Sequence, residues 1–79
     1  MQNTKNPVAK LNHFHLDKMI ELLAVKNDTE LAPLLGCSIS LISRLRSGQR
    51  TFSPQMCARV KFLTRGEITG YVMRPDIYN

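Results

Sequence analysis

Residues 28–47 read D-T-E-L-A-P-L-L-G-C-S-I-S-L-I-S-R-L-R-S, and their small and apolar positions follow a fixed spacing. Ala32 lets two helices cross closely, and Gly36, farther along, allows the left-handed turn that other residues resist. Four apolar side chains lie at helical spacing on either side of this turn: Leu31, Leu35, Ile42 and Leu45. Because the small, turn and apolar positions agree in phase, the stretch predicts a helix-turn-helix.

The chain is short and basic. Its 79 residues, 43% of them hydrophobic, suffice for one compact domain with a mostly aliphatic core. Eleven Lys and Arg against six Asp and Glu give a net charge of +5. Residues 31–66 contain no acid but six bases, which are Arg44, Arg46, Arg50, Arg59, Lys61 and Arg65. This segregation favours a polyanionic partner over an evenly mixed soluble surface.

The sequence offers no sign of a membrane or secretory segment. No apolar run approaches the roughly 18 residues that cross a bilayer, and no secretory leader is recognisable. We therefore expect a cytoplasmic protein that does not bind membranes. Cys37 and Cys57 lack the paired spacing of a zinc site. We expect two buried, reduced thiols, with a disulfide as the minor alternative.

Apolar periodicity and helix-end signals predict an all-α domain of four to five helices. We divide the chain into a flexible N-terminal arm (residues 1–12) and a helix-turn-helix domain with a C-terminal tail (residues 13–79). Helices are expected over residues 16–26, 29–35, 38–46 and 54–64. Asp28 or Thr29 caps the second helix, Ser38 the third and Ser53 the fourth, which ends at Gly66.

Three segments have less regular signals. Pro33 is expected to tighten or shift the first turn of its helix. Thr69 is expected to cap one short helical turn through Met73, with an extended segment over residues 67–73 as the alternative. The N-terminal arm is interpreted as an untethered terminus rather than a minor-groove contact.

Two motifs resemble a known family. L-A-x-x-L-G at residues 31–36, followed by x-S-x-x-x-I-S-R-L-R-S-G at residues 37–48, resembles the Cro-like and cI-like repressors of phages. The ending T-R-G-E-I-T-G-Y-V-M-R-P-D-I-Y, residues 64–78, is similar to the Cro/YdaS-type subgroup, with Met73 where Leu is usual. The resemblance covers residues 16–78. It implies a small lambda-repressor/Cro-like helix-turn-helix domain and a repressor that regulates transcription by binding DNA.

The helix over residues 38–46 is the expected recognition helix, which reads the major groove. If Ile42 and Leu45 point inward, the exposed face carries the predicted base contacts, which are Ile39, Ser40, Ser43, Arg44 and Ser47. Arg44 alone among them can bind guanine bidentately, and Ile39 can pack against a thymine methyl. The serine hydroxyls discriminate only weakly between bases, and capping or solubility explains these serines equally well. Direct readout is therefore expected to be modest, supplemented by DNA shape or dimerisation.

Predicted phosphate contacts surround this helix. The starts of the second and fourth helices offer backbone N–H groups, and the loop after the third helix offers side chains beside the groove. The predicted set is Thr29, Ser38, Arg46, Arg50, Thr51, Ser53 and Gln55. Arg65 is a weaker candidate, and Arg59 and Lys61 are interpreted as solvated.

One motif points to a different chemistry. His13, His15 and Asp17 form His-x-His-x-Asp, which superficially resembles a metal motif of hydrolases. The chain has no other histidine, and a catalytic metal needs more ligands and a cleft. We therefore expect no enzyme, no metal and no cofactor.

The expected partner is double-stranded DNA, bound by a homodimer because one such domain buries little surface. Four residues near the C-terminus either form the dimer contact or pack onto their own core: Val72, Met73, Ile77 and Tyr78. The alternative function is binding of a partner protein through the same domain, as an antitoxin or an interaction module. The acid-free stretch argues for DNA.

Overall fold

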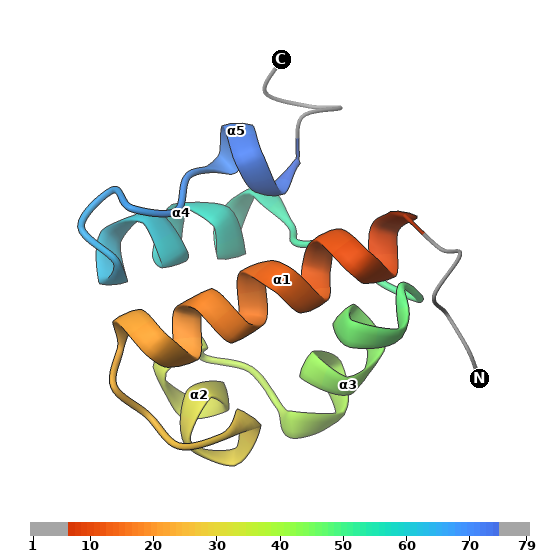
Figure 1. Cartoon of the computed structure of the whole chain (residues 1–79), viewed down its shortest axis with the longest axis horizontal. Coiled ribbons are helices and arrows are strands. Elements are labelled where there is room, and N and C mark those ends of the chain that lie inside the picture. The colour runs from red at the N-terminus through yellow and green to blue at the C-terminus, as the bar shows by residue number, and fades with distance from the viewer. Residues whose placement is uncertain (1–6, 75–79) are drawn as a thin grey trace.

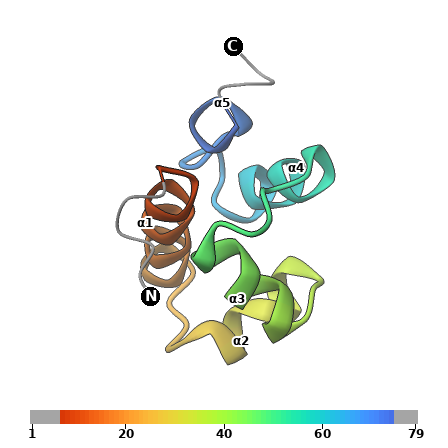
Figure 2. The same cartoon turned by 90° about the vertical axis from the view of Figure 1, so that its right-hand side faces the viewer.

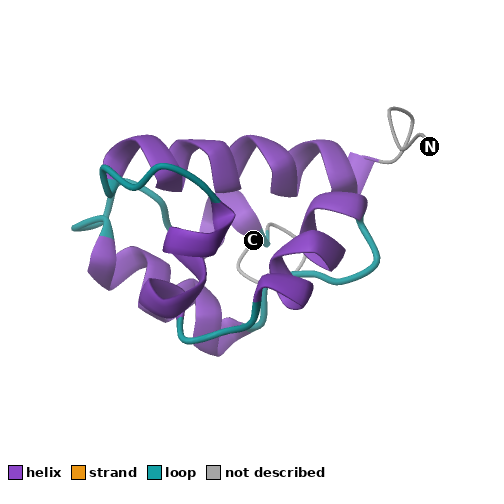
Figure 3. Ribbon diagram, turned by 90° about the horizontal axis from the view of Figure 1, so that it is seen from below, coloured by secondary structure: helices purple, strands orange, loops and turns teal. Residues whose placement is uncertain are grey.

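A computed structural model describes residues 7–74, and within that range the chain forms helices and no strand (Figure 3). The helices are α1 (Pro7–Leu22), α2 (Asp28–Leu35), α3 (Ile39–Ser47), α4 (Pro54–Leu63) and α5 (Gly70–Met73). Figure 1 shows α1 crossing the molecule, with α2 and α3 on one side of it and α4 and α5 on the other. The expected all-α fold class is confirmed.

The hydrophobic core of residues 7–74 is mostly aliphatic, and Phe52 contributes an aromatic ring to it. Every helix contributes to it, and its members are Leu16, Met19, Leu31, Ala32, Leu35, Ile42, Leu45, Phe52, Cys57, Val60, Ile68 and Met73. Burying one side chain the size of Leu or Phe contributes about 1.5–3 kcal/mol. These contacts hold α2 and α3 in place, because helices of eight and nine residues are marginal on their own.

Helix α1 begins and ends earlier than the predicted residues 16–26. Pro7 occupies its first position, where a missing N–H costs nothing. Ala9 and Asn12 then continue the buried face toward Leu16, so residues 7–12 of the expected arm lie in this helix. The helix ends at Leu22, and Ala24 follows with a left-handed φ of 58°. Residues 1–6 lie outside the described range.

Helix α2 has a different cap from the two we expected. The Asn27 side chain accepts a hydrogen bond from the Glu30 backbone N–H at 3.1 Å. In return, a Glu30 carboxylate oxygen accepts from the Lys26 N–H at 2.8 Å, which resembles a capping box. Pro33 lies inside this helix, which nevertheless continues to Leu35. Gly36 then ends it in the left-handed region, with φ of 69°.

The later helix boundaries agree with the sequence to within about one residue. Ser38 caps α3 and Ser53 caps α4, in each case by accepting a hydrogen bond from a backbone N–H of the first turn. Helix α4 ends at Leu63, before the left-handed Arg65 and Gly66. Thr69 precedes the short α5, so the predicted helical turn is confirmed and the extended alternative is wrong. The predicted cap is not formed, because the Thr69 side chain makes no capping hydrogen bond.

Candidate nucleic-acid interface

The turn between α2 and α3 brings together the apolar side chains that the sequence singled out. Leu31, Leu35, Ile42 and Leu45 are all buried in the core, and so is the small Ala32. Gly36 donates its backbone N–H to the Pro33 carbonyl at 3.2 Å and closes α2. The two helices are therefore held against each other by the apolar side chains packed between them. Their outer surfaces remain accessible.

The outer face of α3 carries four of the five predicted base contacts in exposed positions: Ile39, Ser40, Ser43 and Arg44. Ile39 is 50% exposed, so its apolar side chain is accessible on this face. Among residues 7–74, no hydrogen bond or ion pair engages the Arg44 guanidinium. The fifth predicted contact, Ser47, is half-buried, and its hydroxyl donates to the Arg44 carbonyl at 3.1 Å. Ser47 thus completes the end of α3.

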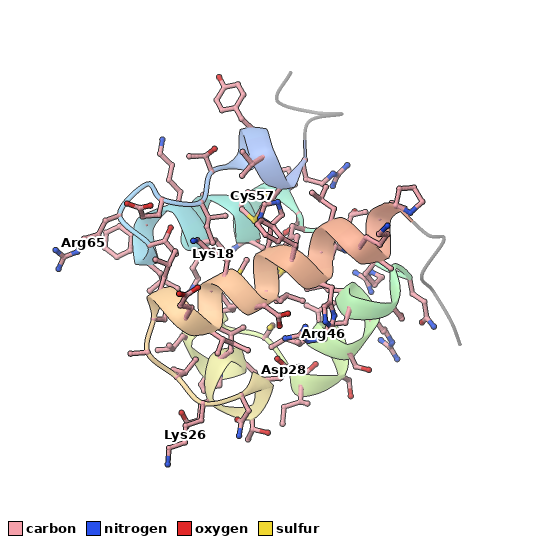
Figure 4. The ribbon with its side chains drawn as sticks, in the orientation of Figure 1. Lys18, Lys26, Asp28, Arg46, Cys57 and Arg65 are labelled. Carbon is pink, nitrogen blue, oxygen red and sulfur yellow. The ribbon has the colours of Figure 1, made fainter. Side chains whose placement is uncertain are left out.

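Arg46 lies on the inner side of α3, and its surroundings differ from those we predicted. Its Nε and Nη2 donate to the two carboxylate oxygens of Asp28, each at 2.8 Å, and Nη1 lies 3.0 Å from an Asp17 oxygen. Figure 4 shows the Arg46 and Asp28 side chains meeting between α2 and α3. The hydrogen bonds to Asp28 are the main cause that raises the pKa of Arg46. Because this guanidinium is already occupied, we remove Arg46 from the predicted phosphate contacts.

The three residues of the His-x-His-x-Asp motif do not converge on one point. His13 accepts a hydrogen bond from Arg46 through Nδ1 at 3.0 Å, and its Nε2 lies 3.5 Å from an Asp17 oxygen. His15 is buried and contacts the Val72 carbonyl through Nε2 at 3.2 Å. Burial lowers the pKa of His15. Within residues 7–74, no group of three or more His, Cys, Asp or Glu side chains is placed to hold a metal.

Asn12 is a residue whose role the sequence did not reveal. Its side-chain amide is buried and donates to the Leu45 carbonyl at 2.9 Å and to the Arg50 carbonyl at 3.0 Å. It therefore ties α1 both to the last turn of α3 and to the loop that follows. The available signal was its spacing from Ala9, Leu16 and Met19, which places this amide on the apolar face of α1.

The predicted phosphate contacts other than Arg46 lie at exposed positions around α3. They are Thr29 at the start of α2, Ser38 before α3, Arg50 and Thr51 in the next loop, and Ser53 and Gln55 at the start of α4. The Thr51 hydroxyl accepts a hydrogen bond from Arg74 at 3.0 Å, and Arg74 also donates to the Phe52 carbonyl at 2.8 Å. These bonds fasten the loop to the end of α5.

Two further basic residues are exposed, and the structure adds detail that the sequence did not give. Arg59, interpreted from the sequence as solvated, donates through Nε to the Leu34 carbonyl at 2.8 Å. It therefore reaches from α4 to the last turn of α2. Arg65 projects away from the molecule at the end remote from α3, as Figure 4 shows. Its position excludes Arg65 from a surface centred on α3.

A cavity of about 310 Å³ adjoins this surface, between the α2–α3 turn and the start of α4. Its lining combines apolar groups such as Leu35 and Leu41 with the side chains of Arg50, Ser53, Gln55 and Arg59. Cys37 borders the cavity and is partly buried, which raises the pKa of its thiol. Cys57 is buried in the core, and neither cysteine forms a disulfide.

The C-terminal residues proposed for a dimer contact separate into different classes. Met73 is buried in the core, so it packs onto its own chain. Val72 is 47% exposed, and Ile77 and Tyr78 lie outside the described residues.

No helix in residues 7–74 has the length and apolar character needed to cross a bilayer.

Comparison with family models, with curated proteins and with solved structures found no match to this chain.

Proposed function

We propose that this protein is a sequence-specific DNA-binding regulator of transcription, most simply a Cro-like phage or prophage repressor acting in the cytoplasm. The observation that carries the proposal is the division of α3 into two faces. Ile42 and Leu45 are fully buried, whereas Ile39, Ser43 and Arg44 are exposed on the opposite side. A short helix held in this way projects its outer side chains into a major groove.

The outer side chains fit a modest direct readout. Arg44 has a guanidinium free for a bidentate contact with guanine, which discriminates by about 1–3 kcal/mol. Ile39 offers an apolar surface for a thymine methyl, and the hydroxyl groups of Ser40 and Ser43 can hydrogen-bond to several bases. Readout of this strength favours a homodimer on a two-fold symmetric site, where the two recognition helices lie about one turn of DNA apart.

Exposed groups around α3 support phosphate binding. Arg50, Thr51, Ser53 and Gln55 follow one another along the loop and the start of α4, and Thr29 begins α2 on the other side. Each phosphate that Arg50 or another exposed cation neutralises releases counter-ions, so affinity should fall linearly in log–log form as salt rises. A binding titration that shows no dependence on salt would contradict this prediction.

A second candidate function, binding of a partner protein, is favoured by exposed aromatic side chains. Phe14 is 62% exposed, Phe62 81% and Tyr71 67%, on α1, α4 and α5 respectively. Figure 2 shows α5 and α4 above α2 and α3. An antitoxin that binds DNA through α3 could thus hold a protein through other helices. Co-purification of a partner with the wild type but not with Phe62→Ser would support this function.

Selection of duplexes from a random pool tests the DNA proposal without knowledge of the operator. We expect enrichment of a two-fold symmetric sequence that contains guanine, and footprinting on DNA flanking the coding region should locate a natural copy. Arg44→Ala should lose preference at one base pair per half-site. Failure of the folded wild-type protein to retain any duplex at low salt would refute the proposal.

A further inference from the structure

We propose that Arg59 and Arg50 hold one backbone phosphate of the bound DNA at the cavity between the α2–α3 turn and the start of α4. This inference rests on the proposed DNA-binding function. It assigns a specific role to Arg59, a residue that the sequence alone left as part of a solvated surface.

The first observation is the contact that the exposed Arg59 makes with the end of α2. Its Nε donates to the Leu34 carbonyl at 2.8 Å, across the gap between α4 and the end of α2. A Cβ placed on Gly36 would lie 3.8 Å from this Nε and 3.9 Å from Cζ, so the guanidinium lies close against the turn. Among residues 7–74, neither Nη group has a hydrogen-bond or ion-pair partner. The end of the guanidinium is therefore held in place with its donors unused.

The second observation is the composition of the cavity. Arg50 lines it together with Arg59, and within residues 7–74 the Arg50 guanidinium also has no partner. Ser53 and Gln55 add polar groups, and among residues 7–74 no carboxylate lines the cavity. Two guanidinium groups without a counter-ion favour an anion with several acceptor oxygens. A phosphodiester has that chemistry, and guanidinium binds it bidentately.

The third observation is the position of the cavity beside the recognition helix. Leu41 of α3 lines it, and Leu41 lies between Ser40 and Ile42 in the same short helix. A phosphate held there would sit next to the groove that α3 occupies. The Nε bond to Leu34 would link that phosphate directly to the end of α2, so the contact would also set the orientation of the helix pair.

The test is a set of salt titrations with Arg59→Gln, Arg50→Gln and the double variant. Lys61→Gln is the matched control, because Lys61 is an exposed cation on the same helix that does not line the cavity. We expect either cavity variant to bind about tenfold more weakly, as for loss of a hydrogen bond to a charged group. The loss should be equal on specific and arbitrary duplexes, and the magnitude of the log–log salt slope should fall by up to about one. Lys61→Gln should change affinity by less than about twofold.

Because both arginines hold one phosphate, the double variant should lose less than the product of the two single losses. Thermal unfolding of Arg59→Gln controls for damage to α2, and Arg59→Lys, which keeps the charge but not the fork, should remain weaker than wild type. We call the proposed pair of Arg50 and Arg59 around one phosphate the clamp. Equal affinities for wild type and both single variants would overturn the clamp while leaving DNA binding intact. Absence of DNA binding by the folded wild type would instead overturn the proposed function together with the clamp.

A separate arm distinguishes a DNA phosphate from a free anion. Inorganic phosphate is added at constant ionic strength, and the unfolding temperature is compared with that in chloride. The clamp predicts little stabilisation, because a single phosphate lacks the contacts of the duplex. Stabilisation of the wild type but not of Arg59→Gln, with unchanged DNA affinity in that variant, would show a small-anion site and overturn the assignment.

Discussion

Arg44 and Arg46 lie two residues apart on α3, and their surroundings differ sharply. Arg44 is exposed, and among the described residues its guanidinium has no partner. The side chain of Arg46 is only 19% exposed and makes a bidentate contact with Asp28. Residues two positions apart on a helix are separated by about 200° around its axis, so Arg44 and Arg46 face nearly opposite ways. Position around the axis of α3, rather than charge, therefore separates exposed side chains from those that hold the fold.

The largest expected effect is on the inner face. Leu45→Ala should lower the free energy of unfolding by about 2–5 kcal/mol, because it leaves a cavity in the core beneath α3. Urea denaturation measures this change. Ser43→Ala, on the outer face, is the control and should stay within about 0.5 kcal/mol of wild type. Similar losses for the two variants would end the distinction between the faces.

Arg44→Ala tests the outer face in the reverse sense. We expect unfolding by urea to be unchanged within about 0.5 kcal/mol, whereas binding to the selected duplex weakens by about 1–3 kcal/mol. Binding to an arbitrary duplex should fall much less. If the variant loses equal affinity for all duplexes, Arg44 contacts the backbone instead of a base.

Asn12→Ala should destabilise the fold by about 1–3 kcal/mol, because the carbonyls of Leu45 and Arg50 lose a buried donor. Denaturant titration measures the loss. Lys10→Ala, an exposed position on the same helix, provides the comparison. Unchanged stability in the Asn12 variant would mean that the two carbonyls find other donors.

Arg46→Gln should cost about 1–2 kcal/mol of stability, between the values for exposed and buried ion pairs. Asp28 and Asp17 then lose their cationic partner. Because we place Arg46 outside the interface, the salt slope of DNA binding by the folded variant should match that of wild type. A slope reduced as far as that of Arg50→Gln would return Arg46 to the phosphate contacts.

The smallest expected effect is a pH dependence from His15. Burial lowers the pKa of this imidazole in the folded state, so the unfolded chain binds more protons near and below the usual pKa of 6.5. Its contribution to stability is therefore present above that pH and is lost as the pH falls. Thermal unfolding between neutral and mildly acidic pH measures the loss, which His15→Gln should diminish. An unfolding temperature of the wild type that rises on acidification would contradict the sign.

Local signals allowed most of the fold to be predicted. Ser38, Ser53 and Gly36 act on backbone groups a few residues away, so their roles can be recognised in sequence. The start of α1 was missed because Asn12 interrupts the apolar pattern, and its partners Leu45 and Arg50 are distant in the chain. A buried amide resembles an exposed one until the packing of helices is known.

The candidate site, like the fold, could be predicted only where local signals decide the outcome. The exposed positions of Ile39, Ser40, Ser43 and Arg44 follow from the phase that Ile42 and Leu45 impose on α3. The roles of Arg46 and Arg59 do not follow, because each depends on a contact with a different helix. Basic residues in one acid-free stretch therefore divide into separate groups only after the tertiary structure is known.

The Arg44 main-chain carbonyl accepts hydrogen bonds from the Gln49 N–H at 2.9 Å, the Arg50 N–H at 3.3 Å and the Ser47 hydroxyl at 3.1 Å. The residue that we propose to face the bases is thus joined through its own backbone to the segment that we propose to bind the sugar–phosphate chain. A shift of that segment would tilt the Arg44 side chain as well. Distortion of a duplex, even at base pairs that no side chain touches, would then change how well the guanidinium meets its base.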